Sequence, residues 1–340
     1  MRRQHAPAKA FTIVEILVVV GIIALLLGML LPALSGAKKR SNKTKELNAI
    51  RQIGLGWTLY ANANNDKLLP GYLDFDVQQR WRVAYEYPNH WDIPAGDLAG
   101  PWTWRLLPYL ENNIPTVHGY ANDVYTDTDD DGRLDMVVVY EPVMLDPSQT
   151  GYDTEQMAIA ADPIAREPAF GYNAYYVGGW WTMESGLPRP LFYDAVSAGT
   201  DKRVSVTSRS VGTIRRPTTL MIFCSASQLY PGLYRSFPDN QPGSHYVVPP
   251  RLGTVAQWSS AGISPGKFGG SSDLQVGELD PTTLLVYPQG GEKVAAPIGR
   301  YNRLAAMLHA DGHTDAGTPG SLIDMRKWID TADHVAFRHE

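Results

Sequence analysis

An unbroken apolar segment near the N-terminus constrains this chain more than any other feature. The segment runs from Phe11 to Leu34 and contains one charged residue, Glu15. At about 1.5 Å per residue, a helix of this length spans the roughly 30 Å hydrocarbon core of a bilayer. A carboxylate in that core costs about 2.5–3.5 kcal/mol on insertion scales, so we expect Glu15 to have a partner. The sequence therefore predicts a transmembrane helix over residues 11–34.

Basic residues flank this segment on both sides. The leader MRRQHAPAKA carries three cations, and five more follow the segment, at Lys38, Lys39, Arg40, Lys43 and Lys45. Positively charged residues near the ends of a span favour the cytoplasmic side. Charge alone therefore slightly favours a cytoplasmic C-terminal side.

The leader, the pentapeptide FTIVE, the apolar run and Pro32 resemble the class III signal of type IV prepilins and type II secretion pseudopilins. Glu15 is fifth and Pro32 twenty-second after the cleavage point that the resemblance implies, as in that family. A prepilin peptidase would cut between Ala10 and Phe11, and the new amine of Phe11 would be methylated. The family usually has Gly before the cut, where this chain has Ala10. Because the peptidase is cytoplasmic, the resemblance implies a large domain outside the cytoplasm.

Physical chemistry supports two of these roles independently. A free amine at Phe11 would be a cation in lipid, and the carboxylate of Glu15 from a neighbouring subunit could neutralise it. Pro32 removes one helical hydrogen bond, which predicts a kink near the end of the membrane segment.

Two other interpretations of the apolar segment stay open. It could be a simple signal anchor, or a secretory signal peptide cut after Ser35-Gly36-Ala37. As a secretory signal peptide, it would have an apolar region longer than the usual length of about 7–15 residues. Neither interpretation accounts for Glu15.

The helix is expected to continue past the membrane segment, over residues 35–65. Apolar residues recur at spacings of three and four, which predicts one buried face formed by Leu47, Ile50, Gly54, Trp57 and Ala61. The opposite, polar face would consist of Lys43, Lys45, Asn48, Arg51 and Gln52. Asparagines between Asn62 and Asp66 should end the helix, because Asn tolerates a left-handed backbone. The segment LNAIRQIGLGWTLYANANNDKLLP resembles a large prepilin-like subgroup found mostly in planctomycetes.

Composition limits the remaining chain to an acidic, packed domain. Loss of the leader, with Arg2, Arg3 and Lys9, would change the net charge from −5 to −8, which disfavours nucleic-acid binding. Hydrophobic residues make up 44% of the chain, enough for a packed core. The single cysteine, Cys224, excludes an intrachain disulfide and is expected in the core.

We therefore predict an α+β, pilin-like fold: a long N-terminal helix packed on an antiparallel β-sheet domain with long loops. Five segments are expected: a leader (1–10), a transmembrane helix (11–34), its amphipathic continuation (35–65), an extracytoplasmic globular domain (66–330) and an exposed tail (331–340).

Within the globular domain, several local structures are predicted. In the first half they are a short helix or turn packed on the core over 102–110, a strand over 171–177 and a turn over 178–181. A buried strand leading to Cys224 follows, and then long loops over 230–300. Near the end we predict a β-hairpin around Asp311-Gly312 and a capped helix over 321–330. The prepilin-like subgroup often carries a His, nine residues, then Asp-Gly. Here Tyr301 stands in the place of that His.

An acidic loop, DTDDDGRLD, begins at Asp127. Oxygen ligands at its positions 1, 3, 5 and 9, with Gly132 at position 6, match a calcium-binding loop. The predicted structural Ca²⁺ ligands are the side chains of Asp127, Asp129, Asp131 and Asp135 and the carbonyl of Arg133. The twelfth position is Val138 instead of the Glu of an EF-hand. The alternative is a solvated acidic turn.

No catalytic constellation is recognisable in the sequence. His309 and His313 are four residues apart, but Asp311-Gly312 between them breaks a helix, so this spacing does not indicate zinc. Tryptophans between residues 67 and 120 could bind sugar, although core packing is the commoner role.

We predict a non-enzymatic subunit of a type IV pilus-like or type II secretion pseudopilus filament in the inner membrane. Its partners would be other pilin subunits, the prepilin peptidase, the assembly platform and membrane lipid. The alternative is a membrane-anchored carbohydrate-binding protein or enzyme that uses the signal for export.

Overall fold

The computed structural model describes residues 13–86, 92–111, 165, 168–192, 195–196, 203–229, 243–253, 255–260, 284–286, 294–297, 299, 304–335 and 337–339. The chain divides into two compact units, Met1–Asn42 and Lys43–Glu340. The described elements combine a long helix with antiparallel and mixed β-sheets, so the α+β class is confirmed.

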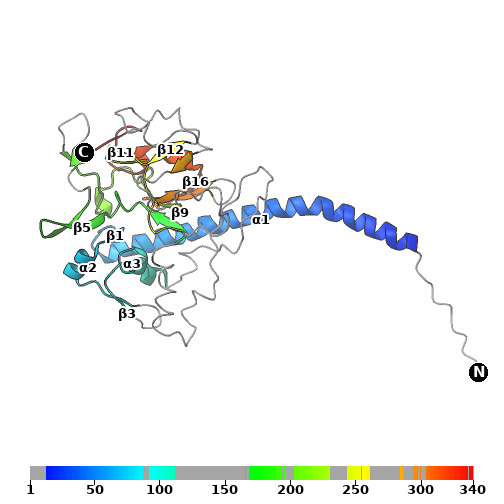
Figure 1. Cartoon of the computed structure of the whole chain (residues 1–340), viewed down its shortest axis with the longest axis horizontal. Helices are drawn as coiled ribbons and strands as arrows, with labels where there is room; N and C mark the ends of the chain where they lie inside the picture. The colour runs from blue at the N-terminus through cyan, green and yellow to red at the C-terminus, as the bar shows by residue number, and fades with distance from the viewer. Residues whose placement is uncertain are drawn as a thin grey trace, which may run out of the picture. The chain divides into compact units, whose positions relative to one another are not determined.

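Helix α1 (Ile13–Ala63) provides the helical part of the first unit and the first element of the second (Figure 1). Its backbone stays helical through Pro32. It ends where the asparagines were expected to end it: Asn65 and Asp66 have φ values of 56° and 61°, in the left-handed region. The side chain of Asn64 donates to the carbonyl of Tyr60 (2.8 Å), which satisfies one of the last helical acceptors.

A five-stranded antiparallel sheet forms the centre of the second unit. Its longest strand, β9 (Met221–Leu229), pairs with β15 (Ala305–His309) on one edge and with β4 (Phe170–Tyr172) and β14 (Val294–Pro297) on the other. Strand β16 (Thr314–Gly317) extends the sheet beyond β15. The turn between β15 and β16 contains Asp311 and Gly312, with Gly312 at φ 88°, which confirms the predicted hairpin.

Shorter elements surround this sheet. A second sheet contains β1 (Tyr72–Leu73), β5 (Trp180–Glu184) and β6 (Leu187–Pro190). Two-stranded pairs are formed by β2 (Tyr85–Glu86) with β3 (Asp92–Ile93), β7 (Ala195–Val196) with β8 (Arg203–Val204), β10 (Arg251–Leu252) with β11 (Val255–Ala256), and β12 (Trp258–Ser260) with β13 (Leu284–Val286). The helical segments are α2 (Phe75–Trp81), α3 (Thr103–Leu106), η1 (Leu107–Leu110), η3 (Val211–Thr213), η5 (Pro319–Ile323) and η6 (Met325–Lys327).

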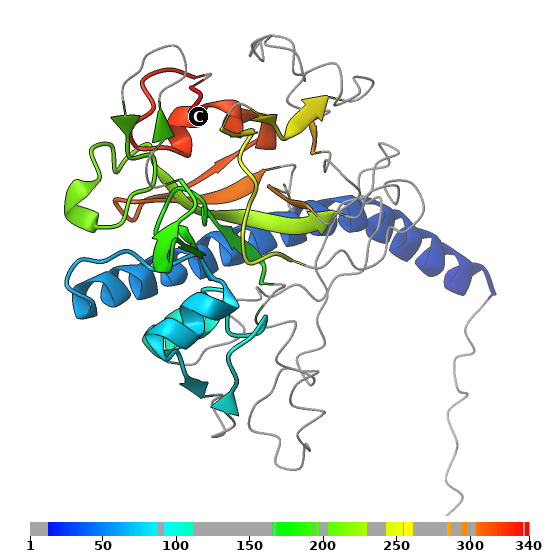
Figure 2. The ribbon, with the colours of Figure 1, turned by 60° about the vertical axis from the view of Figure 1, so that its left-hand side comes forward.

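Two apolar clusters cover the two faces of the central sheet. The first contains Ile50, Ile53 and Trp57 of α1 together with Phe223 of β9 and Leu308 of β15. Figure 2 shows the C-terminal half of α1 running alongside the sheet. The second contains Cys224, Met307 and Trp328. Since residues alternate across a strand, neighbours such as Phe223 and Cys224 face opposite clusters. Cys224 is fully buried, as predicted.

The prediction of a strand over 171–177 is correct only for its beginning, because Asn173 redirects the chain. Its buried side-chain nitrogen, Nδ2, donates to the carbonyls of Met221 (3.0 Å) and Trp328 (2.8 Å). Its main-chain carbonyl accepts from the amide of Val177 (2.9 Å). The residues after Tyr172 form a turn instead. Gly178, at φ 69°, lies in the predicted turn that follows, but Trp180 already begins β5.

The predicted helix over 321–330 is replaced by the short 3₁₀ helices η5 and η6. Asp324 separates them: its backbone is extended (φ −69°, ψ 108°), and its side chain accepts from the amide of Arg326. Aspartate competes with the helical hydrogen-bond pattern in this way and favours a new helix start.

The expectation of an exposed C-terminal tail is wrong. Ala332 and Phe337 are buried in the second cluster, and His339 is 2% exposed. Nε2 of His339 lies 3.0 Å from the hydroxyl of Tyr176. The region 230–300 also contains more regular structure than expected, since β10 to β14 lie there.

Candidate functional site

The apolar half of α1 is the first candidate site. Among the described residues, Ile13–Leu30 is the one helical segment long and apolar enough to cross a membrane. Every side chain from Ile13 to Leu30 is exposed, and Ile13 is 81% accessible. An apolar surface of this extent on a soluble chain marks contact with lipid or protein. The segment therefore has the properties of a membrane anchor or a signal sequence.

The predicted processing and assembly residues lie at the start of this segment. Glu15 is in the first turn of α1, where a carboxylate interacts favourably with the positive end of the helix dipole, and its side chain is exposed. Pro32 is inside the helix. Ala10 and Phe11 lie outside the described residues.

The predicted calcium loop also lies outside the described residues, with its ligands Asp127, Asp129, Asp131, Arg133 and Asp135. Within the described part of the chain, no three His, Cys, Asp or Glu side chains are grouped so that they could hold a metal ion. The calcium site therefore stays a prediction from sequence.

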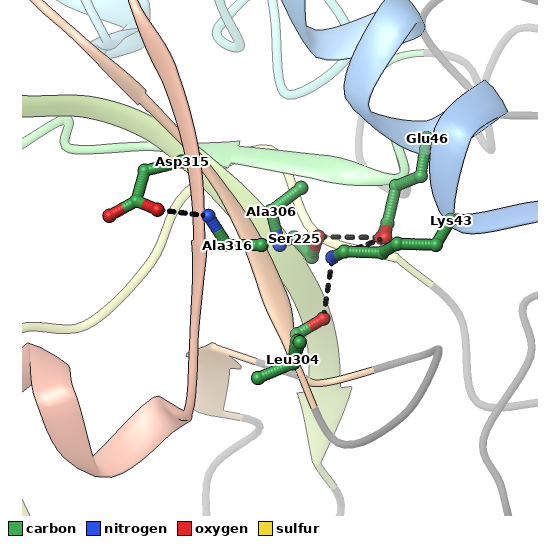
Figure 3. Close-up of polar contacts among 7 residues, drawn as sticks. All are labelled: Lys43, Glu46, Ser225, Leu304, Ala306, Asp315 and Ala316. Carbon is green, nitrogen blue, oxygen red and sulfur yellow. Dashed lines mark hydrogen bonds and ion pairs between the residues drawn. The ribbon is translucent and has the colours of Figure 1, made fainter. Parts of the chain in front are cut away.

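A buried polar network lies at the beginning of the second unit. The ammonium group of Lys43 donates to Oε2 of Glu46 (3.0 Å) and to the carbonyl of Leu304 (2.7 Å). Oε1 of Glu46 accepts from the hydroxyl of Ser225 on β9 (2.6 Å), and that hydroxyl accepts from the amide of Ala306 on β15 (2.9 Å). Figure 3 shows Glu46 reaching from α1 to Ser225 on β9 and Lys43 reaching to Leu304, the residue before β15. We call these residues the helix–sheet junction.

The helix–sheet junction fixes the position of α1 along the sheet. Lys43 and Glu46 are 8% and 6% exposed, so both charges are largely removed from water. Such charges are tolerable only when they are paired and hydrogen-bonded, and a shift of α1 by one residue would separate them from Ser225 and Leu304. Lys43 was expected on the solvent-exposed polar face of α1, and that prediction is wrong.

The next turns of α1 closely approach the sheet and the η1 segment. A Cβ atom on Gly54 would lie 2.9 Å from Cδ1 of Leu308, and one on Gly56 would lie 2.7 Å from Cδ2 of Leu110. Nε1 of Trp57 donates to the hydroxyl of Tyr172 (3.2 Å). The predicted buried face is therefore confirmed for Gly54 and Trp57, and the C-terminal half of α1 is part of the core of the second unit.

The tryptophans between residues 67 and 120 divide into two groups. Trp102 and Trp104 are buried, and Nε1 of Trp102 donates to the carbonyl of His245 (2.5 Å), so core packing explains both. They lie at the α3–η1 segment, which confirms the short helix predicted there. Trp81 on α2 is different, with 42% of its surface exposed. Trp91 lies outside the described residues.

His309 and His313 face each other across the end of the β15–β16 hairpin. Their rings stack with centroids 4.2 Å apart and an interplanar angle of 2°. His313 is also paired with Asp311 (2.5 Å). Burial, together with the neighbouring His313, lowers the pKa of His309 to about 4. The two rings lie face to face, so their nitrogens do not converge on a common metal position.

We expect the second unit to lose stability as the pH falls from about 6.5 to 4. Burial lowers the pKa of His339 to about 4, as it does for His309, whereas both would titrate near 6.5 when unfolded. The unfolded chain therefore binds more protons in this range, and each histidine can cost up to about 3 kcal/mol at pH 4. Urea unfolding of the detergent-solubilised chain at pH 7, 5.5 and 4.5 measures this loss. His339→Gln should reduce the dependence of the free energy of unfolding on pH. An unchanged dependence would contradict the role given to His339.

Sequence reasoning missed the helix–sheet junction. One signal was present, since Lys43 and Glu46 are three residues apart and such residues are neighbours on a helix. Nothing in the local sequence indicated that this pair faces inward, because Ser225 and Leu304 are far away in the chain.

Comparison with known proteins gave no match to a family model, to a curated protein or to a solved structure.

Proposed function

We propose that this chain is a pilin-like structural subunit, assembled through its N-terminal helix into a type IV pilus-like or type II secretion pseudopilus filament. One observation carries the proposal. A single helix, α1, has an exposed apolar half with Glu15 in its first turn, and a second half built into the core of an α+β unit. A subunit that assembles through a helix needs both an apolar surface for its neighbours and a firm attachment of that helix to its own domain.

The helix–sheet junction supports this role mechanically. Lys43 is the first residue of the second unit, so the junction attaches α1 to the sheet at the start of that unit. The buried face from Ile50 to Trp57 resists sliding behind it. In this proposal, the subunit resides in the inner membrane with one span and its large domain outside the cytoplasm.

The mature protein should begin at Phe11, with a methyl group on its amine. A prepilin peptidase acting after Ala10 produces this end and leaves Glu15 at the fifth position. Intact-mass and N-terminal peptide mass spectrometry of the membrane fraction measure it. A mature chain that starts at Lys38 would instead identify an ordinary secretory signal peptide and remove the basis of the filament proposal.

We expect calcium to stabilise the protein through the loop that starts at Asp127. Five carboxylates within nine residues repel one another unless a cation neutralises them. Calcium binding to the folded state raises the free energy of unfolding by about 2.7 kcal/mol when calcium is in hundredfold excess over Kd. The gain in millimolar calcium is smaller for a weak extracellular site with a Kd of about 10⁻⁴–10⁻³ M. Thermal unfolding in millimolar calcium and in chelator measures the shift. Asp129→Ala and Asp131→Ala should abolish it, whereas Asp130→Ala, at the position that points away from the ion, should keep it.

A further inference from the structure

Helix α2 presents an aromatic and cationic surface that the filament role does not use. Phe75 and Trp81 on this helix are 49% and 42% exposed, whereas Trp102, Phe223 and Trp328 are fully buried. Arg80 and Arg82 flank Trp81 and are exposed as well. We call Arg80, Trp81 and Arg82, together with Trp181 on which the ring of Trp81 packs, the α2 platform.

The α2 platform is held in place from below. The ring of Trp81 packs edge to face on Trp181, with centroids 4.9 Å apart and an interplanar angle of 61°. Nε1 of Trp181 donates to the carbonyl of Gly178 (2.7 Å). Buried Gln78 fixes the helix, since its amide nitrogen donates to the carbonyls of Leu73 (2.7 Å) and Gly96 (3.0 Å) and its oxygen accepts from the amide of Gly96 (2.8 Å). A ligand would therefore meet an indole that needs little ordering.

The two arginines are available to an anion. Neither guanidinium forms an ion pair with a carboxylate among the described residues, although Asp76 lies one turn before Arg80. Arg82 is the C-terminal capping residue of α2 and has a φ of 54°. This left-handed conformation favours Gly or Asn, so the backbone of an arginine there is strained. A cation at this strained position is consistent with a use for its side chain.

We propose that the α2 platform binds an acidic polysaccharide whose sugar rings carry carboxylates. The C–H bonds of a pyranose ring form a flat, weakly positive face, which fits the negative face of an indole such as that of Trp81. The planar guanidinium groups of Arg80 and Arg82 bind carboxylates through paired hydrogen bonds. Arg80 and Arg82 give this surface two exposed cations in a chain whose net charge is −5.

The same surface fits a protein partner less well. The centre of a protein interface is depleted of charge and covers about 800 Å² on each side. Here the indole of Trp81 has an arginine on either side of it in the chain, and Asp76 follows Phe75 directly. Removal of these charges from water would oppose a dry contact, whereas a hydrated polysaccharide leaves them partly solvated.

The test is calorimetric titration of the full chain in detergent micelles with polygalacturonate, and with dextran and dextran sulfate as neutral and sulfated comparators. Polygalacturonate should bind and dextran should not. Trp81→Ala should weaken binding about tenfold or more. Arg80→Gln with Arg82→Asn should do the same and remove most of the salt dependence, and Asn is compatible with the left-handed backbone at residue 82. Leu187→Ala and Arg51→Gln, which alter an exposed apolar residue and an exposed cation outside the platform, should leave Kd unchanged.

Several results would overturn the proposal. They are no binding of polygalacturonate, unchanged binding in Trp81→Ala, and dextran sulfate binding that is equally strong in every variant, which would indicate ion exchange. Self-association of the wild-type chain that disappears in Trp81→Ala, without polygalacturonate binding, would assign the surface to a second copy instead. Near-ultraviolet circular dichroism of each variant shows whether it is folded. The proposal is independent of filament assembly, because the full chain is tested as isolated subunits.

Discussion

Glu46→Ala is expected to reduce the free energy of unfolding of the second unit by about 3–5 kcal/mol, the range for removal of one partner from a buried ion pair. The substitution leaves the ammonium group of Lys43, 8% exposed, with the carbonyl of Leu304 and no carboxylate from Glu46. It also removes the acceptor of the Ser225 hydroxyl, which bridges to the amide of Ala306. Urea unfolding of the detergent-solubilised chain, followed by near-ultraviolet circular dichroism, measures the effect.

Matched variants separate the charge from the packing. Lys45→Ala changes an exposed lysine on the same turn of α1 and should have an effect close to zero. Lys43→Met combined with Glu46→Leu removes both charges, so it should recover most of the stability lost in Glu46→Ala. If Glu46→Ala were no more than 1 kcal/mol or so less stable than the wild type, the junction would not be the main attachment of α1 in this region.

Features that depend on neighbouring residues were predictable from the sequence. The period of Ile50, Gly54 and Trp57 gave the buried face of α1, and the asparagines before Asp66 gave its end. The Asp311-Gly312 turn gave the β15–β16 hairpin. Each of these is decided within one or two turns of chain, where periodicity and turn chemistry act.

Features that depend on distant residues were not predictable in the same way. Asn173 ends β4 because its side chain binds Met221 and Trp328, which are far along the chain. Likewise, the tail is buried because His339 is hydrogen-bonded to the hydroxyl of Tyr176 and Phe337 packs in the second cluster. Short polar residues in an otherwise apolar strand pattern give no indication of whether such partners exist.

The second large effect is expected at Glu15, which Glu15→Ala should reveal as a loss of filament incorporation without a loss of membrane insertion. Insertion should be unchanged or improved, because the substitution removes a carboxylate from an apolar segment whose other side chains are exposed. Assembly should fail, because the amine of Phe11 on a neighbouring subunit loses its counter-charge in lipid. Loss of a buried pair at roughly 3 kcal/mol corresponds to about a hundredfold lower incorporation.

Three variants make the role of Glu15 testable. Glu15→Gln keeps the shape of the side chain and removes its charge, so it should resemble Glu15→Ala if the amine is the partner. Glu15→Asp keeps the charge on a shorter side chain and should retain part of the incorporation. Gly21→Ala is the matched control, since a Cβ at Gly21 meets no atom within 4 Å and adds one apolar group to the same segment. Incorporation is measured as the ratio of subunit in sheared filaments to subunit in the membrane fraction. A normal ratio for Glu15→Gln would show that charge pairing is not what the carboxylate contributes, and the assembly role proposed for Glu15 would then be wrong.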